Sequence, residues 1–254
     1  MQPIRLFCLP YAGGAAHIYR DWPRDVPAWL TVTPLHLPGR GLRLRDPLEP
    51  RWDRLIDDLA GSIVASLGHA SDSPFALYGH SLGGLIAFEL AHALRERIGR
   101  EPVWLGIGGC PAPAFQTVEN AWLTCPEQTV IAELERFGQT SPELLANREF
   151  VEMILPVVRN DFHLYGTWRA RPRAPLAGAL HVFGGRTDPA TQDLASLDGW
   201  RSETFGAFER SLFDGGHFFI DAQRRALLDT ITSSLNLIGL LRSRRDRIEQ
   251  PFPA

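Results

Sequence analysis

Residues 75–83 read Phe-Ala-Leu-Tyr-Gly-His-Ser-Leu-Gly, and this stretch decides the fold. Its first four residues form a short apolar run that predicts a buried strand, and a helix of 3.6-residue period is predicted directly after it, over Leu82–Ile98. The Gly-x-Ser-x-Gly pattern between them is typical of a sharp turn from strand to helix in which the serine backbone is strained. Ser81 would then lie at the top of a sheet, at a helix N-terminus that stabilises negative charge. The alternative is a glycine-rich turn whose serine has no role.

Outward from this motif, short apolar runs bounded by Gly or Pro alternate with longer segments of helical period. That alternation predicts an α/β fold with a mostly parallel central sheet flanked by helices. Strands are expected over residues 4–9, 30–36, 75–78, 103–107, 179–183 and 208–213. Helices are expected over residues 51–67, 82–98, 129–137, 148–165 and 222–242.

Residues 111–173 interrupt the alternation, because they carry helical patterns and no strand pattern. We expect a single domain over residues 1–254, with residues 111–173 as a helical insertion within it. An insertion beyond the carboxyl ends of the strands is where the lid of an active site would lie, so we interpret it as a lid. A structural subdomain without a gating role is the alternative.

The composition excludes several classes of protein. A net charge of −3 over 254 residues does not suit a dedicated nucleic-acid-binding protein. All 26 basic residues are arginine, which excludes a P-loop lysine, a pyridoxal phosphate Schiff base and a Ser-Lys dyad. Cys8, Cys110 and Cys125 are too widely spaced for a zinc site and are typical of a reducing cytoplasm. Because no apolar run suits a leader peptide or a membrane span, we expect a soluble, cytoplasmic protein.

A serine hydroxyl becomes a useful nucleophile only when a base takes its proton. In this architecture the acid and then the histidine follow the nucleophile along the chain, and four histidines follow Ser81. His92 and His163 lie in predicted helices, and His181 lies inside a predicted strand. His217 lies on a loop just past the last strand, after two glycines that let the backbone turn. We therefore predict that His217 is the general base.

The acid is expected on the loop after the preceding strand, where Asp188 follows residues 179–183. At that edge of a parallel sheet its carboxylate could hold the Nδ1–H of His217. Asp214 is an alternative, although it lies close to His217 in sequence, and Asp161 in the insertion is another. An Asp-Pro pair is also a common way to start a turn.

Acyl transfer also requires N–H groups that bind the oxyanion of the tetrahedral intermediate. One is expected from Leu82, the residue after the nucleophile, and the other from the loop after the first strand. That loop reads Leu-Pro-Tyr-Ala-Gly-Gly over residues 9–14, and Ala12 is its most suitable donor. The glycine pair does not form a dinucleotide-binding loop, because Gly-x-Gly-x-x-Gly is absent.

Five motifs occur in a fixed order along the chain. They are Pro10-Tyr-Ala-Gly-Gly14, Pro38-Gly-Arg-Gly41 with Arg43, Gly79-His-Ser-Leu-Gly83, Gly184-Gly-Arg-Thr-Asp-Pro189 and Gly215-Gly-His-Phe-Phe219. Together they resemble the type II (external, editing) thioesterases that accompany polyketide and nonribosomal peptide synthetases. Residues 155–162 also resemble the lid region of that family. Gly41 departs from it, since the family usually has an acidic residue there.

The resemblance implies the α/β-hydrolase fold, a triad of Ser81, Asp188 and His217, and an oxyanion hole of the Ala12 and Leu82 N–H groups. It implies a thioester substrate on the phosphopantetheine arm of an acyl or peptidyl carrier protein, from which aberrant or stalled acyl groups are hydrolysed. No metal or cofactor of its own, no nucleic acid and no membrane partner is expected, and we expect a monomer. The alternatives are a stand-alone esterase or acyl-CoA thioesterase, or a non-catalytic hydrolase-fold partner protein.

Two sets of side chains each allow two interpretations. One set could dock an acidic carrier protein, although we favour an ordinary solvated surface. It consists of Arg40, Arg43 and Arg45 with Arg169, Arg171 and Arg173. The other set could line an acyl chamber, although we favour the core of the lid. It consists of Trp122, Phe137, Phe162, Tyr165 and Trp168.

Overall fold

A single parallel sheet organises the chain. The computed structural model describes residues 2–68, 73–119, 121–138 and 140–248, so both ends of the predicted domain lie outside the described residues. Six strands pair in the order β2-β1-β3-β4-β5-β6, all of them parallel. They are β1 (Ile4–Leu9), β2 (Leu30–Pro34), β3 (Phe75–His80), β4 (Trp104–Gly108), β5 (Ala179–Gly185) and β6 (Phe208–Phe213). The predicted parallel sheet is confirmed.

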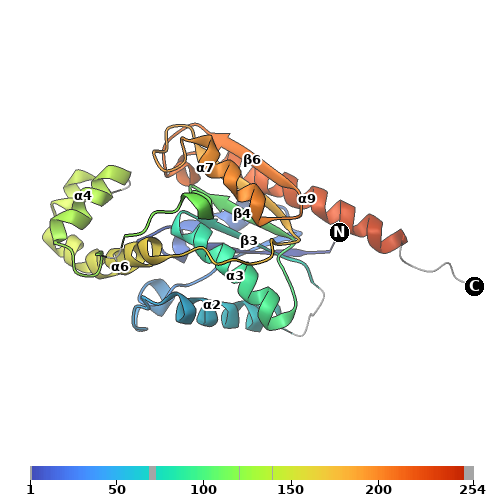
Figure 1. The fold of residues 1–254 in the computed structure, drawn as a ribbon, viewed down its shortest axis with the longest axis horizontal. Helices are drawn as coiled ribbons and strands as arrows, with labels where there is room; N and C mark the ends of the chain where they lie inside the picture. Colours follow the sequence, from blue (N-terminus) through green and yellow to red (C-terminus); the bar gives the residue numbers. More distant parts are fainter. Residues whose placement is uncertain (1, 69–72, 120, 139, 249–254) are drawn as a thin grey trace, which may run out of the picture.

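Helices cover both faces of the sheet, as Figure 1 shows. On one face, α2 (Trp52–Leu67) and α3 (Leu82–Ile98) pack into the larger apolar core. On the other face, α1 (Trp22–Asp25) and α9 (Arg224–Ile248) contribute to a second core. Successive side chains of a strand point to opposite faces, so β3 gives Leu77 to the first core and Tyr78 to the second. Burial on both sides is why the strands read as continuous apolar runs.

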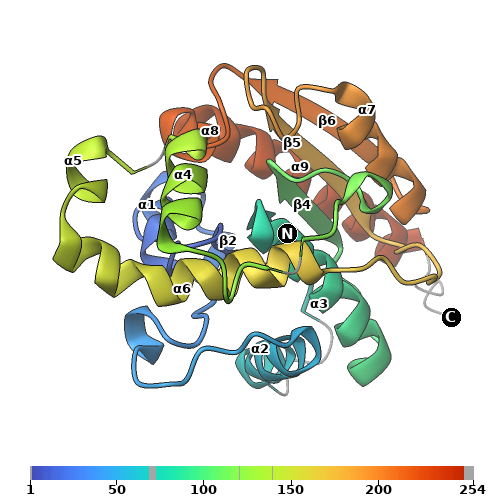
Figure 2. The same ribbon diagram turned by 60° about the vertical axis from the view of Figure 1, so that its left-hand side comes forward.

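The helical insertion lies between β4 and β5. It contains α4 (Glu127–Phe137), α5 (Pro142–Leu145) and α6 (Arg148–Thr167), and no strand occurs among its described residues. Figure 2 shows α4 lying over α6, with α5 beyond one end of the pair. Val130 of α4 and Val158 of α6 belong to a small apolar cluster of their own, separate from the two cores of the sheet. The predicted helical insertion is therefore found, and its action as a lid stays a prediction.

Some elements begin or end at other residues than expected. β2 ends at Pro34, two residues earlier than expected, although the N–H of Leu35 still donates to the carbonyl oxygen of Cys8 in β1 at 2.9 Å. α9 starts at Arg224 and extends to Ile248, past the expected end at residue 242. The remaining short helices were not expected, because four or five residues are too few to show a helical period. They are α1, α5, α7 (Leu194–Asp198) and α8 (Phe219–Ala222).

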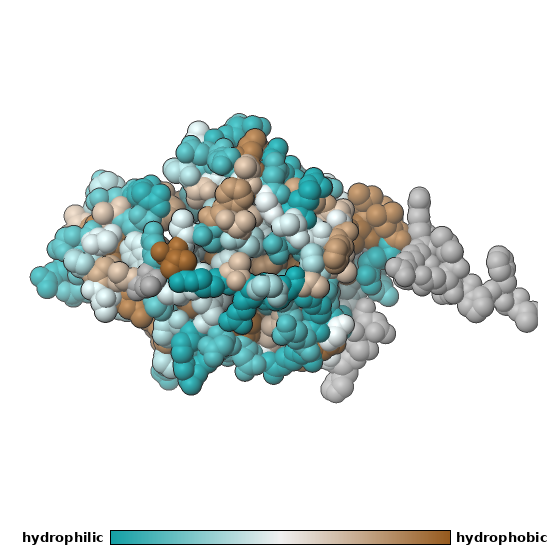
Figure 3. Space-filling model, in the orientation of Figure 1, coloured by the Kyte–Doolittle hydropathy of each residue, from teal (hydrophilic) through white to brown (hydrophobic). Residues whose placement is uncertain are grey.

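The face drawn in Figure 3 mixes hydrophilic side chains with local apolar patches. One such patch lies on the protruding part of α9, where Leu237, Leu240 and Leu241 are all more than half exposed. Within the part of the chain that the structure describes, no helix is both long and apolar enough to cross a membrane. The expected monomer stays a prediction.

Candidate active site

The turn between β3 and α3 is strained at the predicted serine. Ser81 has φ 54° and ψ −120°, and among the described residues it is the one non-glycine residue with positive φ. A Cβ on Gly79 would lie 1.8 Å from the carbonyl oxygen of Gly83, and a Cβ on Gly83 would lie 2.2 Å from that of Leu9. The two glycines are therefore required by close backbone approach, and the predicted strand–turn–helix is confirmed.

The backbone around Ser81 is fixed on two sides. Its N–H donates to the carbonyl oxygen of Gly108 at the end of β4, at 2.7 Å. Leu82 is the first residue of α3, so its N–H has no acceptor within the helix. Ala12, on the loop after β1, lines the same cavity as Ser81. Both expected oxyanion donors thus belong to segments that meet at this edge of the sheet.

His217 and Asp188 are joined by a hydrogen bond. The Nδ1–H of His217 donates to Oδ2 of Asp188 at 3.0 Å, because a carboxylate can only accept. Asp188 is fully buried and also accepts from the N–H of Ala190 at 2.9 Å and the hydroxyl of Thr191 at 3.0 Å. Burial alone would raise the pKa of Asp188, but the hydrogen bond and charge of His217, with these two donors, hold it below its usual value. Asp188 is therefore a carboxylate at neutral pH.

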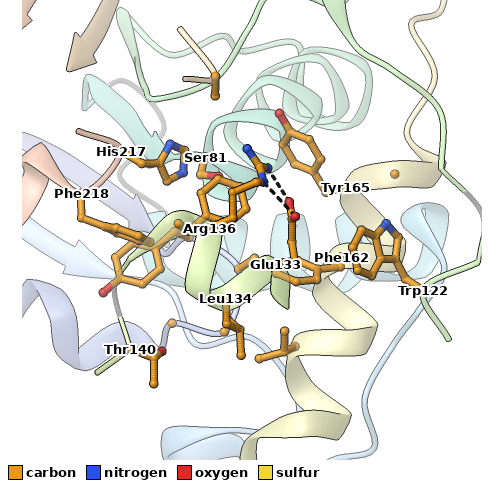
Figure 4. A pocket seen from close by; sticks show the side chains of 18 of the residues that line it. Ser81, Trp122, Glu133, Leu134, Arg136, Thr140, Phe162, Tyr165, His217 and Phe218 are labelled. Atoms are coloured by element: carbon orange, nitrogen blue, oxygen red, sulfur yellow. Dashed lines mark hydrogen bonds and ion pairs between the residues drawn. The ribbon is translucent and has the colours of Figure 1, made fainter. Parts of the chain in front are cut away.

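The two loops that carry this pair bring it to Ser81. Asp188 follows β5 and His217 follows β6, and both strands end at the edge where β3 delivers Ser81. Ser81 and His217 line one cavity, and Figure 4 shows the imidazole of His217 beside the serine. The sequence order serine, acid, histidine thus becomes one spatial cluster.

The alternative acids are engaged elsewhere. Asp214 is largely exposed and pairs with Arg186 at 3.1 Å. Asp161 is fully buried, but its carboxylate binds Arg40 rather than a histidine. Neither contacts the imidazole of His217, so the contacts favour Asp188 as the acid.

Two of the three other candidate histidines, His92 and His181, have structural partners, whereas Nδ1 of His163 in α6 is buried without a hydrogen bond. His181 is buried and shares hydrogen bonds with the hydroxyls of Ser211 and Ser234, at 2.9 and 3.1 Å. His92 accepts at Nδ1 from the guanidinium of Arg95 at 2.8 Å. The sequence excludes both histidines from catalysis because one lies in a strand and the other in a helix, and these contacts agree with that exclusion.

His80 is a neighbour of His217 that the sequence does not indicate. It precedes the nucleophile, so the order serine–acid–histidine gave no reason to consider it. Its Nε2–H donates to the carbonyl oxygen of His217 at 2.7 Å, and it is fully buried. Burial, together with the proximity of His217, lowers the pKa of His80 to about 3. His80 is therefore a neutral donor that fixes the backbone of His217.

A cavity of about 530 Å³ opens onto Ser81 and His217. Its walls come from the insertion as well as from the loop after β1. Four of the five aromatic residues assigned to the lid core line it: Trp122, Phe137, Phe162 and Tyr165. Trp168 packs instead in the larger core, with its Nε1–H donating to Glu89. Trp122, Phe137 and Phe162 belong to the apolar cluster of the insertion, as expected of the lid core, and they also line the cavity, whereas Tyr165 packs against the larger core.

A charged pair also faces the cavity. Glu133 and Arg136 of α4 form a two-point ion pair in which Nε of Arg136 lies 2.9 Å from Oε2 of Glu133 (Figure 4). The ring of Phe137, the next residue, lies 4.8 Å from the ring of His217 between centroids. α4 therefore covers the imidazole directly.

Three of the six arginines bind carboxylates, whereas Arg45, Arg169 and Arg171 are exposed, as expected of a solvated surface. Arg40 is buried against Asp161, and Arg173 pairs with Glu89 at 2.7 Å with little exposure. Arg43 binds Asp46 and Asp58. A solvated surface is therefore the wrong description of Arg40 and Arg173. No group of three or more metal-ligating side chains occurs among the described residues.

These features define the class of protein. The α/β-hydrolase fold is recognised from three features of the molecule. They are a parallel sheet with helices on both faces, a serine at a strained turn after β3, and a buried Asp–His pair after β5 and β6. Residues 4–235 match the family model described as the thioesterase domain, which covers most of the chain. The chain belongs to the thioesterase domain family.

Several relatives are named for the biosynthesis of gramicidin or borrelidin. The chain is 33% identical to linear gramicidin dehydrogenase LgrE of Brevibacillus parabrevis, over 93% of this chain and 90% of that protein. It is 30% identical to gramicidin S biosynthesis protein GrsT of Aneurinibacillus migulanus, over 92% and 90%. The structure of the type II thioesterase BorB from the borrelidin biosynthetic cluster is 30% identical, with a TM-score of 0.80 over 91% and 92% of the two chains. The resemblance to type II thioesterases is confirmed.

Proposed function

We propose that this chain is a type II thioesterase of polyketide or nonribosomal peptide biosynthesis. It hydrolyses thioesters between aberrant or stalled acyl groups and the phosphopantetheine arm of a carrier protein. The observation that carries the proposal is that Ser81 opens onto a cavity beside His217, whose imidazole is held by buried Asp188. Membership of the thioesterase domain family and the similarity to BorB support a thioester as the bond that is cleaved.

The proposed chemistry proceeds through an acyl-serine. Because Asp188 holds the Nδ1–H of His217, the Nε2 lone pair is free to accept the proton of Ser81 as it attacks the thioester carbonyl. The N–H groups of Leu82 and Ala12 bind the oxyanion, and collapse of the tetrahedral intermediate expels the thiolate, which His217 protonates. Water activated by His217 then hydrolyses the acyl-serine and restores the free serine.

The cavity accounts for the acyl group. Its aromatic walls provide apolar contact for an acyl chain, while the phosphopantetheine arm belongs to the carrier protein and reaches Ser81 from outside. The chain then needs no cofactor of its own. The carrier protein is the macromolecular partner that this chemistry requires.

The test compares wild-type protein with Ser81→Ala on an acyl group loaded onto a carrier protein. We expect loss of hydrolysis by several orders of magnitude in the variant, with an unchanged circular dichroism spectrum. A fluorophosphonate probe should label the wild type and not the variant. Unchanged turnover by Ser81→Ala contradicts the assigned nucleophile.

A second comparison separates the alternative functions. The wild type is assayed with acyl-carrier protein, the same acyl group on coenzyme A, and its p-nitrophenyl ester. A higher kcat/KM for the carrier supports the proposal. Equal or higher kcat/KM for the ester or for coenzyme A indicates a stand-alone hydrolase, and absence of both labelling and turnover indicates a non-catalytic partner protein.

A further inference from the structure

A buried ion pair connects the insertion to the core beside the active site. Asp161 of α6 has no exposed side-chain surface, and the side chain of Arg40 is 8% exposed. Nη1 of Arg40 lies 2.5 Å from Oδ2 of Asp161, and Nη2 lies 2.6 Å from Oδ1. This two-point geometry is the most directional that an arginine and a carboxylate can adopt.

Both members of the pair also bind the loop after β1. Oδ2 of Asp161 accepts the N–H of Gly13 at 2.7 Å, and Nη1 of Arg40 donates to the carbonyl oxygen of Gly14 at 3.1 Å. Gly13 has φ 77°, and a Cβ there would lie 3.3 Å from the side chain of Val158 in α6. The helix and the loop are thus joined directly by one hydrogen bond and close packing, and through Arg40 by the ion pair and a second hydrogen bond.

These contacts control the direction of one particular N–H. The carbonyl of Tyr11 and the N–H of Ala12 belong to the same trans peptide plane and point in opposite directions. The N–H of Gly14 donates to that carbonyl at 2.9 Å, which fixes the plane. Since Gly13 and Gly14 are held by Asp161 and Arg40, the orientation of the Ala12 N–H depends on the ion pair.

Stability alone does not explain such an arrangement. Replacing a buried ion pair by apolar side chains of similar volume is often neutral or stabilising, so burial of two charges indicates a need for fixed geometry rather than for free energy of folding. The loop fixed by this pair is the one that lines the cavity next to Ser81. Orientation of a donor at that place is what acyl transfer requires.

We propose that Arg40 and Asp161 are positioning residues that orient the Ala12 N–H for the oxyanion, so that helix α6 of the insertion is part of the catalytic apparatus. The inference deepens the proposed function and rests on it. Removing one member of the pair leaves Ser81, His217 and Asp188 in place but releases the loop. The loss should therefore fall on the stabilisation of the transition state, not on the binding of substrate.

The experiment measures kcat, KM and inhibitor affinity for Asp161→Asn and Arg40→Lys. The substrate is a p-nitrophenyl ester, and the inhibitor is an alkyl boronic acid, whose tetrahedral adduct on Ser81 needs the oxyanion donors. We expect kcat to fall about 100-fold with KM within about twofold, and boronate affinity to fall in parallel with kcat/KM. Arg40→Lys keeps the charge but lacks the two-point geometry, so it should lose nearly as much.

The matched control is Asp58→Asn. Asp58 pairs with Arg43, only three residues from Arg40, but its side chain is 41% exposed and neither partner is bonded to residues 11–14. Its kcat should stay within about twofold of the wild type. If Asp161→Asn and Arg40→Lys are folded by circular dichroism and keep both kcat and boronate affinity, the pair is merely structural and the inference is wrong. Because the ester reports on Ser81 directly, failure of the wild type on a loaded carrier protein would contradict the proposed function and not this inference.

Discussion

The hydrogen bond between His217 and Asp188 can run in one direction only, from the imidazole to the carboxylate. The carboxylate only accepts, so the imidazole must carry its proton on Nδ1 and keep the Nε2 lone pair for Ser81. In Asp188→Asn the side-chain amide can donate to Nδ1, which favours the opposite tautomer. We expect kcat for the p-nitrophenyl ester to fall about 10³- to 10⁴-fold, with the fold retained by circular dichroism.

The matched control for that substitution is Asp214→Asn, since Asp214 lies near His217 in sequence but is largely exposed and pairs with Arg186. It should keep wild-type kcat within about twofold. Similar losses in the two variants, or no loss in Asp188→Asn, would show that the tautomer argument fails.

Among single residues, the sequence predicts those whose role depends on chain order and on the ends of strands. Ser81, Asp188 and His217 follow three strands that can be recognised from apolar runs, and parallel strands end at one edge. Arg40 and Asp161 are 121 residues apart, and their pairing exists only because the insertion folds back on the loop after β1. Nothing local in the sequence indicates such a contact, so the sequence suggests Asp161 only as an alternative acid of the triad.

At the scale of elements, the junction of β3 and α3 depends on backbones that touch. A Cβ on Gly83 would lie 2.2 Å from the carbonyl oxygen of Leu9, so Gly83→Ala must push α3 away from β1. We expect a loss of more than about 3 kcal/mol in the free energy of unfolding, or failure to fold. Urea denaturation followed by circular dichroism measures it.

Gly99→Ala is the control for this prediction. Gly99 ends α3 with φ 65°, and no atom lies within 4 Å of where its Cβ would be. The substitution therefore introduces only the cost of a left-handed alanine, about 1–2 kcal/mol. If Gly83→Ala costs no more than Gly99→Ala, the close approach of the two backbones is not what requires glycine at residue 83.

The long elements of the fold could be predicted because they have clear periods. α2 buries one apolar face, α3 is buried continuously over residues 82–88, and the strands are short apolar runs closed by Gly or Pro. The insertion could be predicted as helical, but not the way α4 lies over His217. That placement depends on contacts of Phe137 and of the Val130–Val158 cluster, which form between segments that the sequence leaves unrelated.

Taken as a whole, the molecule encloses polar side chains on both faces of its sheet and at its catalytic edge. His80, His92 and His181 are each at most 3% exposed. Burial is the first cause that lowers their pKa values, to about 3, about 3 and about 4, and in His92 the charges of Arg173 and Arg95 add to it. The folded protein therefore keeps all three neutral at a pH where the unfolded chain protonates them.

This difference in protonation predicts that the folded protein loses stability at pH values well above those at which carboxylates titrate. Between the unfolded pKa near 6.5 and the lowered folded values, the unfolded chain binds more protons, so stability falls as pH falls. From pH 7.5 to pH 5.5 each histidine should remove about 1.4 kcal/mol from the free energy of unfolding, about 4 kcal/mol for the three. Urea denaturation at the two pH values measures this loss together with a further one from His36 and His163, whose pKa values burial also lowers. In His181→Gln the difference between the two pH values should shrink by about 1.4 kcal/mol, whatever the variant does to stability at pH 7.5. Equal stability of the wild type at both pH values would show that these side chains are protonated alike in the folded and unfolded states.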